Sequence, residues 1–187
     1  FEKSTLEPGY IKAYLPGVSE NGGQYTHAAI WAIIATAMLK LNNKSQEFYR
    51  MINPIEHGKT KELIWRYKVE PYAIAADVYG ASNLLGRGGW TWYTGSSSWF
   101  YKAGIEYILG LKIENGILRI EPCIPKDWKE YRIRYEYKTS VYNISVKNPN
   151  ESETGEVKEF FVNGQKIEEK QLKLIDNGRI YEIEVVL

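Results

Sequence analysis

The sequence has few side chains that bind metals or form cross-links. Among its 187 residues there is one cysteine, Cys123, and there are two histidines, His27 and His57. A single cysteine excludes a disulfide within the chain, and two widely separated histidines lack the spacing of zinc ligands. We therefore predict no metal site, and we expect His57 to be structural.

Long apolar segments and an excess of one charge are also absent. The longest apolar stretch, residues 28–39, falls short of the roughly 20 residues that a membrane-spanning helix needs. Lysine and arginine total 24 against 23 acidic residues, and residues 1–109 and 110–187 carry net charges of +2 and −1, so neither part is a basic nucleic-acid-binding arm. No signal peptide is evident, so a cytoplasmic location is expected. Because the chain begins with Phe1 rather than Met, we expect a piece of a longer protein.

The first part of the chain has the pattern of helices joined by glycine-rich loops. Residues 1–25 contain Pro-Gly and Gly-Gly pairs and no sustained period, which is typical of loops. The helix predicted from Thr26 is apolar around nearly its whole circumference, which predicts burial on most sides. Four helices of this kind do not close a bundle, so we interpret them as the last helices of a larger helical array. The helices are predicted at residues 26–41, 45–51, 71–79 and 96–109.

From Leu111 onward the hydrophobic period changes to two, which is typical of strands. Asn-Gly pairs between alternating runs favour two-residue hairpin turns. We therefore predict an antiparallel sheet domain over residues 111–187, in the form of a sandwich. The three pairs are at residues 115–116, 163–164 and 177–178, and the strands are expected at 111–113, 117–120, 131–137, 141–146, 160–162, 165–167, 172–175 and 179–186.

The tryptophans are distributed unevenly. All six lie at or before Trp128. A single tryptophan most often belongs to the core, but Trp90, Trp92 and Tyr93 are too close in sequence to point inward together from one element. Part of this segment is therefore expected to line a surface or a cleft, where a flat apolar ring can stack on a sugar.

Two loop segments contain groups suited to binding an anion. Residues 14–27 include Glu20 and His27 and lead into a helix N-terminus, where backbone N–H groups favour negative charge. Residues 86–98 offer small residues from Gly95 onward at the start of another helix, but they lack the lysine of a P-loop. The alternative for the first segment is a structural loop whose polar groups only satisfy its own backbone.

Three carboxylates in this part of the chain are candidates for acid or base chemistry. Glycoside hydrolysis uses a pair of carboxyl groups on either side of the scissile bond. Two of Glu20, Glu70 and Asp77 would have to converge in the fold, and their spacing leaves this open.

Several motifs, in this order along the chain, resemble the C-terminal part of the glycoside hydrolase family ninety-four phosphorylases. The form Gly-Gly-Trp-Thr-Trp-Tyr-Thr-Gly-Ser at residues 88–96 is most similar to the cyclic β-1,2-glucan synthase branch of that family. The resemblance extends from about Gly9 to the end of the chain. The motifs are residues 20–29, 53–55, 69–72, 86–96, 104–111 and 120–125.

The resemblance implies an α+β multidomain fragment. Residues 1–110 would be the last helices and active-site loops of an (α/α)6 barrel, and residues 111–187 the antiparallel β-sandwich. The implied reaction is inverting phosphorolysis, in which phosphate attacks the anomeric carbon of a β-glucoside and a carboxylic acid protonates the leaving oxygen. Inorganic phosphate is then a co-substrate and no cofactor is required. A glucan synthase parent would imply membrane attachment.

The resemblance also assigns roles to particular residues. His27, Thr94 and Gly95 match phosphate-contacting positions, and Tyr14 and Glu20 match positions beside the leaving-group sugar. Ser19 departs from the family, which often has a basic residue there, and this puts the acceptor specificity in question.

No residue of this chain matches the general acid. The family's aspartate comes from an earlier stretch of the barrel, so we expect the 187 residues alone to be inactive. The missing part of the enzyme and a second copy in a homodimer are then the expected partners. Two other functions stay open, namely a non-catalytic carbohydrate-binding module and an interaction module that completes a barrel.

Overall fold

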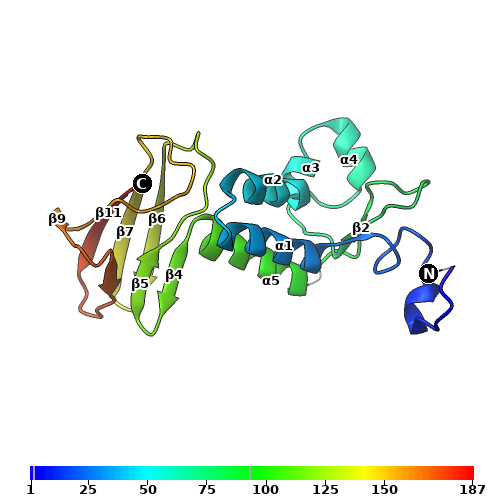
Figure 1. The fold of residues 1–187 in the computed structure, drawn as a ribbon, viewed down its shortest axis with the longest axis horizontal. Helices are drawn as coiled ribbons and strands as arrows, with labels where there is room; N and C mark the ends of the chain where they lie inside the picture. The colour runs from blue at the N-terminus through cyan, green and yellow to red at the C-terminus, as the bar shows by residue number, and fades with distance from the viewer. Residues whose placement is uncertain (2, 93) are drawn as a thin grey trace. The chain divides into compact units, whose positions relative to one another are not determined.

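The computed structural model describes residues 1, 3–92 and 94–187, with only the backbone described for Thr94. The chain forms two compact units (Figure 1). The N-terminal unit contains residues 1–33 and 47–102, and the C-terminal unit contains residues 34–46 and 103–187. The predicted division into residues 1–110 and 111–187 stays a prediction. In the described part of the chain, no helix is both long enough and apolar enough to cross a membrane.

Helices dominate the first part of the chain, as predicted. Those expected at 26–41, 45–51 and 96–109 are present with shifted ends, the last of them continuing into a π-helix. The α-helices are α1 (Thr26–Met38), α2 (Asn42–Ile52), α3 (Pro54–His57), α4 (Lys61–Tyr67) and α5 (Thr94–Lys102), with a 3-10 helix at Gly9–Ala13 and the π-helix at Ala103–Ile108.

The helix predicted at residues 71–79 is wrong. Residues 71–72 form an exposed turn, and the buried residues 73–77 lead into the short strand β2 (Asp77–Val78). A short apolar run has the same pattern in a buried strand as in a buried helix, and periodicity alone does not separate the two. The sequence analysis also missed α3 and α4, although Asn53 and Thr60 accept capping hydrogen bonds at their starts.

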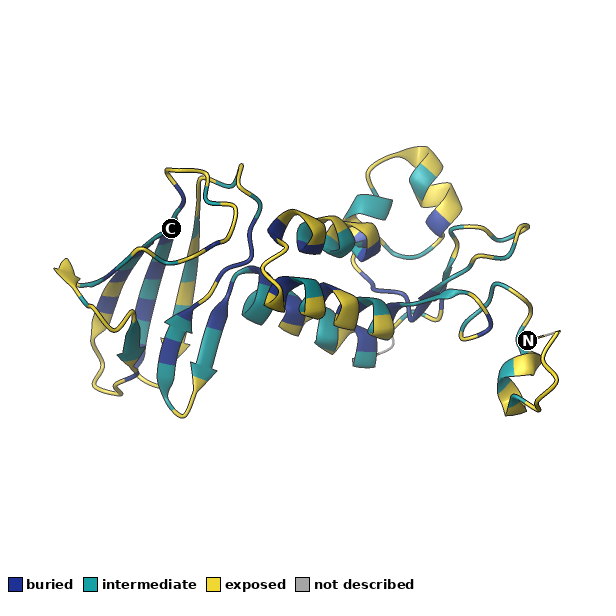
Figure 2. Ribbon diagram, viewed as in Figure 1, coloured by how far each residue is buried: buried dark blue, intermediate teal, exposed yellow. Residues whose placement is uncertain are grey.

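Helix α1 is buried on one face only, which contradicts the predicted burial on most sides. Ile30 and Ile33 are fully buried, whereas Trp31 is 55% exposed and Met38 is 70% exposed. Figure 2 shows buried and exposed stretches alternating along this helix. The other face carries exposed apolar side chains, of which Trp31 contacts the rings of His27 and Trp99 at 4.9 and 6.0 Å between ring centres. The helix therefore presents an apolar surface to solvent.

A small antiparallel sheet brings distant segments of the N-terminal unit together. Its order is β1 (Gln24–Tyr25), β2, β3 (Gly88–Gly89), with Asp77 opposite both Tyr25 and Gly89. Strand β1 leads directly into α1. This sheet therefore places the loop before α1 beside the segment that precedes α5.

The C-terminal unit contains two sheets that share one hydrophobic core. The first sheet has the order β10-β5-β4 and the second β6-β7-β11-β8-β9. Fully buried side chains from both sheets, such as Leu118, Ile144 and Phe160, meet in this core. The strands are β4 (Leu111–Glu114), β5 (Ile117–Ile120), β6 (Glu130–Tyr137), β7 (Ser140–Lys147), β8 (Glu159–Val162), β9 (Gln165–Lys166), β10 (Gln171–Lys173) and β11 (Ile180–Val186).

The prediction that this sandwich is antiparallel throughout is wrong in one place. Strand β11 pairs with β7 in parallel and with β8 antiparallel. Alternation of apolar and polar residues gives the faces of a strand but not its neighbours, so the sequence pattern could not specify this pairing.

Two of the three Asn-Gly pairs form the predicted hairpins. Asn115-Gly116 joins β4 to β5 and Asn163-Gly164 joins β8 to β9, with positive φ at all four residues. The third prediction is wrong, because Asn177-Gly178 carries the chain from β10 in one sheet to β11 in the other.

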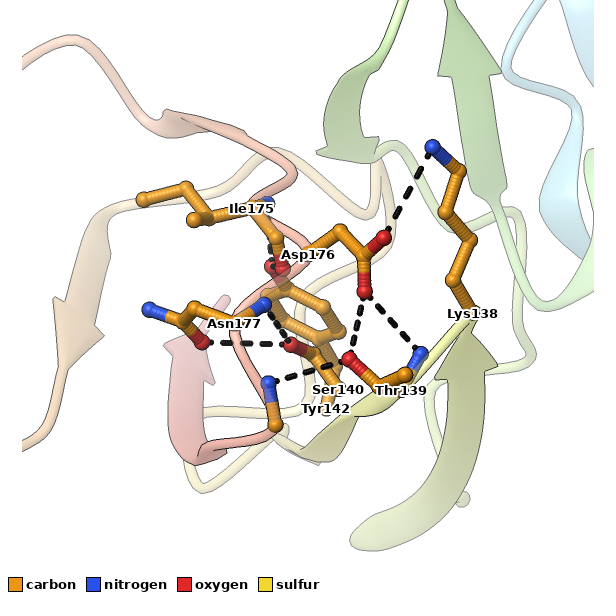
Figure 3. A network of polar contacts seen from close by, with 8 residues as sticks. Lys138, Thr139, Ser140, Tyr142, Ile175, Asp176 and Asn177 are labelled. Carbon is orange, nitrogen blue, oxygen red and sulfur yellow. Dashed lines mark hydrogen bonds and ion pairs between the residues drawn. The ribbon is translucent and has the colours of Figure 1, made fainter.

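A polar network holds this third turn against the β6–β7 turn (Figure 3). The Thr139 N–H and hydroxyl donate to the Asp176 carboxylate, and the Asn177 N–H donates to Ser140 Oγ at 3.0 Å. The Thr139 hydroxyl oxygen also accepts from Gly178 N at 3.1 Å. These contacts across different turns replace the local hairpin pairing that the dipeptide predicted.

Candidate functional site

A cavity in the N-terminal unit lies between the loop before α1 and the small sheet. Its volume is about 150 Å³, and a cavity of that size accepts a six-membered ring. Three tyrosines, a tryptophan and two carboxylates are among its walls. The lining residues are Tyr14, Val18, Ser19, Glu20, Tyr25, Ala76, Asp77, Tyr79 and Trp90.

The turn at residues 18–21 forms one wall and is fixed by hydrogen bonds. The Asn21 N–H donates to the Val18 carbonyl at 3.1 Å, and the Asn21 side-chain amide donates to the Tyr14 carbonyl at 2.8 Å. The Ser19 N–H donates to Asp77 Oδ2 at 2.8 Å, from a left-handed backbone with φ of 48°. Because the loop is tied to β2 through Asp77, Tyr14 and Glu20 have defined positions at the cavity.

The backbone of the same loop also lies close to the segment that follows β2. The Gly80 N–H donates to the Gly17 carbonyl at 2.7 Å. A Cβ atom on Gly17, which has φ of 87°, would lie 2.2 Å from the Ala81 nitrogen. Only glycine fits at this position, so the approach of the loop to β2 depends on it.

The two carboxyl groups at the cavity have opposite pKa shifts. A hydrogen bond from the Ser19 hydroxyl lowers the pKa of Glu20, whose carboxylate is exposed and 2.5 Å from that hydroxyl. Burial raises the pKa of Asp77, which is only 4% exposed, and the nearby charge of Glu20 adds to the rise. Of the three carboxylates considered from sequence, these two converge, whereas Glu70 accepts a hydrogen bond from Trp92 Nε1 instead.

His27 lies outside this cavity, in the first turn of α1. Its ring packs against Trp31 at 4.9 Å and against Trp99 of α5 at 5.6 Å between ring centres. These contacts hold the beginning of α1 beside α5. The His27 Nε2 atom is buried and has no hydrogen-bond partner among the described residues. A buried polar atom without a partner is rare in folded proteins and calls for an explanation.

The predicted phosphate-binding residues are described only in part. Gly95 is half-buried in the first turn of α5, next to the fully buried Ser96. The side chain of Thr94 lies outside the described residues, as does Tyr93. The backbone at the start of α5 is therefore the part of this predicted site that the structure describes.

The segment before α5 presents aromatic side chains to the surface, as expected. Trp90 is 75% exposed and Trp92 is 70% exposed, and both have positive φ, at 47° and 61°. Bulky residues seldom adopt this conformation, and it is concentrated at functional sites. The Trp92 ring meets Tyr72 edge-on at 6.1 Å, and Trp90 lines the cavity.

Asp77 was a candidate carboxylate in the sequence, with its convergence left open, whereas the contributions of Tyr25 and Tyr79 to the cavity were not predicted. Asp77 and Tyr79 lie in the segment that was predicted to be a helix, so their convergence with the loop before α1 could not be expected. A signal was nevertheless present, since Asp77 directly follows a run of small apolar residues, as a residue at the end of a buried strand would.

His57 has the structural role that was predicted for it. Its ring stacks on Tyr67 at 4.4 Å, and its Nε2 atom lies 2.8 Å from the Met51 carbonyl oxygen. Across the described residues, no group of three or more His, Cys, Asp and Glu side chains is placed to hold a metal ion.

Comparison with known proteins gives two family matches. Residues 1–110 match the glycosyl hydrolase 94 superfamily, catalytic domain. Residues 111–168 match the C-terminal domain of glycosyl hydrolase family 65.

Several curated proteins are similar to the chain over most of its length. The cyclic beta-(1,2)-glucan synthase NdvB of Rhizobium meliloti (strain 1021) is 46% identical over 151 residues, which are 81% of this chain and 5% of that protein. The N,N'-diacetylchitobiose phosphorylase of Vibrio furnissii is 33% identical over 86% of this chain and 20% of its own length. The solabiose phosphorylase of Paenibacillus borealis is 28% identical over 95% of this chain and 23% of its own. The chain therefore spans less than a quarter of the length of these relatives.

Proposed function

Since the chain belongs to the glycosyl hydrolase 94 superfamily, we propose that it supplies the phosphate and acceptor-sugar contacts of an inverting β-glucoside phosphorylase. The resemblance drawn from the sequence motifs is confirmed by this match and by the similarity to NdvB. In the proposed reaction, phosphate attacks the anomeric carbon of a β-glucoside and α-glucose 1-phosphate is released.

The acceptor side of the proposed site is the cavity that contains Tyr14 and Glu20. Its aromatic walls suit the apolar face of a pyranose ring, and its carboxylates accept hydrogen bonds from sugar hydroxyls. These are the two residues that the sequence motifs assigned to the leaving-group sugar, and they share one cavity. This arrangement supports an acceptor-binding role.

The phosphate side of the proposed site is the pair of helix starts at His27 and Gly95. The single observation that carries this proposal is the buried, unpartnered His27 Nε2. A phosphate oxygen would supply the missing partner, and the N–H groups at the start of α5 would add donors without a metal.

We further propose that the general acid and the donor-sugar contacts come from outside these residues. None of the carboxylates at the cavity matches the acid of the family, and general acid catalysis is worth about 10²- to 10⁴-fold. The exposed apolar face of α1 is where the rest of an (α/α)6 barrel or a second copy would pack. On this proposal the 187 residues alone are inactive. A cytoplasmic location stays part of the proposal, with membrane attachment if the parent is a glucan synthase.

The carbohydrate-binding alternative would need aromatic side chains on an open face of the sandwich. The outward positions of the central strands β7 and β11 carry Asn143 and Lys147 against Glu182 and Glu184. Phe161 of β8, opposite Glu184, adds one aromatic ring beside these polar and charged positions, which do not form an aromatic platform for a sugar.

Phosphate binding to the chain tests the proposal. We expect phosphate to shift the NMR signals of the His27 imidazole, and we expect His27→Ala to weaken phosphate binding by about tenfold or more. His57→Ala, which removes the other histidine, is the matched control and should leave phosphate affinity unchanged. Equal phosphate affinity in the His27→Ala variant would contradict the assignment. Release of glucose 1-phosphate from a β-glucan by the chain alone would contradict the predicted inactivity.

A further inference from the structure

The acceptor cavity has a charge composition that restricts which sugars can enter it. Two of its nine lining residues, Glu20 and Asp77, are carboxylic acids, and none is lysine, arginine or histidine. The Ser19 hydroxyl stabilises the charged form of Glu20. A ligand that brought its own carboxylate would meet like charge with no cation to offset it, and such juxtapositions disfavour binding strongly.

One oxygen of the Asp77 carboxylate accepts a hydrogen bond from the protein, and the other is available to a ligand. Its Oδ2 atom accepts from the Ser19 N–H at 2.8 Å, and the structure gives Oδ1 no hydrogen-bond partner in its described part. The residue as a whole is 4% exposed, and Oδ1 is not among the fully buried atoms without a partner, so this oxygen can be reached from the cavity. A hydroxyl group in the cavity would satisfy it, whereas a second carboxylate would not, because an ionised carboxylate has no proton to donate.

The position of the Asp77 carboxylate is fixed by the strand opposite. Gly89 of β3 faces Asp77, and a Cβ atom there would lie 2.4 Å from Asp77 Oδ1 and 2.5 Å from the Tyr79 hydroxyl. Glycine at this position therefore leaves room for both side chains at the cavity wall. The available oxygen has a defined place, which is what selective recognition requires.

We infer that the cavity selects a neutral sugar and rejects sugar acids, with Asp77 as the residue that sets this specificity. Asp77 Oδ1 and the Glu20 carboxylate accept hydrogen bonds from sugar hydroxyls while the pyranose ring lies against the aromatic walls. Uronic and aldonic acids are excluded by the two carboxylates. This inference rests on the proposed function, since it takes the cavity as the acceptor site.

Two probes that differ only at C6 test the inference. Methyl β-D-glucoside has a hydroxymethyl group where methyl β-D-glucuronide has a carboxylate. Ligand-observed NMR titration of the chain at pH 7 gives the affinity for each. We expect the glucoside to bind about tenfold or more tightly than the glucuronide, in line with the cost of like-charge contacts.

Variants of Asp77 and Glu20 test whether the charge of these two carboxylates sets the preference for the glucoside. Asp77→Asn keeps an oxygen for the Ser19 N–H, so the loop should stay in place. Combined with Glu20→Gln, it should reduce the preference for the glucoside to about threefold or less. Glu62→Gln with Glu169→Gln, which removes two exposed carboxylates away from the cavity, is the control for net charge and should leave the preference unchanged. Amide NMR spectra check that each variant is folded.

The outcomes distinguish this inference from the proposed function. Equal or tighter binding of the glucuronide to the unaltered chain overturns the inference, and so does a preference that survives in the double variant. Binding of neither probe overturns the assignment of the cavity. Phosphate binding at His27 is measured separately, so its loss alone would contradict the proposed function and leave the sugar preference standing.

Discussion

At the scale of single residues, the surroundings of a side chain determine what it contributes. The Tyr142 ring is fully buried and stacks on Tyr181 at 4.8 Å. Its hydroxyl donates to the Ile175 carbonyl at 3.1 Å and accepts from the Ile175 N–H at 2.7 Å (Figure 3). One hydroxyl therefore satisfies both polar groups of a backbone that leaves β10.

We expect Tyr142→Phe to lower the free energy of unfolding by about 1–3 kcal/mol, because it leaves two backbone groups of Ile175 without partners. Tyr135→Phe on β6 is the matched control, since the structure gives the half-buried Tyr135 hydroxyl no hydrogen bond within its described part. That change should stay within about 0.5 kcal/mol. Urea denaturation followed by circular dichroism measures both, and equal losses would contradict the role given to the Tyr142 hydroxyl.

The contrast between Glu20 and Asp77 is another effect of surroundings. Both are carboxylic acids at one cavity, yet a hydroxyl lowers the pKa of the first and burial raises the pKa of the second. The motif around Glu20 could be recognised from sequence because the loop is continuous. Asp77 was a candidate from sequence, but its convergence with Glu20 could not be derived, because it depends on β-pairing with segments far away in the chain.

At the scale of elements, turns with the same backbone angle differ in what surrounds them. Gly110 and Gly116 both have φ of 75°. A Cβ atom on Gly110 would lie 2.2 Å from the carbonyl carbon of Glu121, whereas one on Gly116 would meet nothing within 4 Å. Both the close packing and the positive φ require glycine at Gly110, whereas at Gly116 only the positive φ requires it.

We expect Gly116→Ala to cost about 1–2 kcal/mol of stability, from left-handed strain alone. Gly110→Ala should cost about 2–5 kcal/mol, because the backbone of residues 121–122 must also move. Thermal unfolding of the two variants side by side measures the difference. A Gly110→Ala variant no less stable than Gly116→Ala would mean that the close approach is absent in solution.

The sequence predicted those elements whose signals are local. The hairpins at residues 115–116 and 163–164 follow from Asn-Gly turns, and α1 follows from a long apolar pattern. The predictions for residues 71–79 and for the turn at residues 177–178 were wrong, because pairing with distant segments determines the structure there. In both cases pairing across the fold outweighs the local preference.

At the scale of the whole molecule, the exposed face of α1 is the feature with consequences for behaviour in solution. Contiguous apolar surface on a monomer marks an interaction site or causes association. The proposed barrel and the proposed homodimer each cover this face. The exposed apolar side chains on it are Ala28, Trp31, Ala32, Ala35 and Met38.

We expect the chain to associate reversibly at concentrations of about 100 μM, and we expect Ala35→Glu with Met38→Lys to return it to a monomer without a change in net charge. Gln165→Glu with Gln171→Lys, on β9 and β10, makes the same exchange of charges away from this face and should leave association unchanged. Sedimentation velocity at several concentrations measures the distribution. A chain that stays monomeric throughout would show that the α1 face does not drive association.

The position of β11 determines when the larger sheet can be completed. Its neighbours are β7 and β8, so the β6–β7 and β8–β9 hairpins have no direct pairing with each other. On the ribosome both hairpins emerge from the exit tunnel before residues 180–186 do. Until then each has an open edge strand, and such edges invite pairing with other nascent chains. The interval between the emergence of the hairpins and that of β11 is therefore the stage of biosynthesis at which a chaperone would protect the chain most.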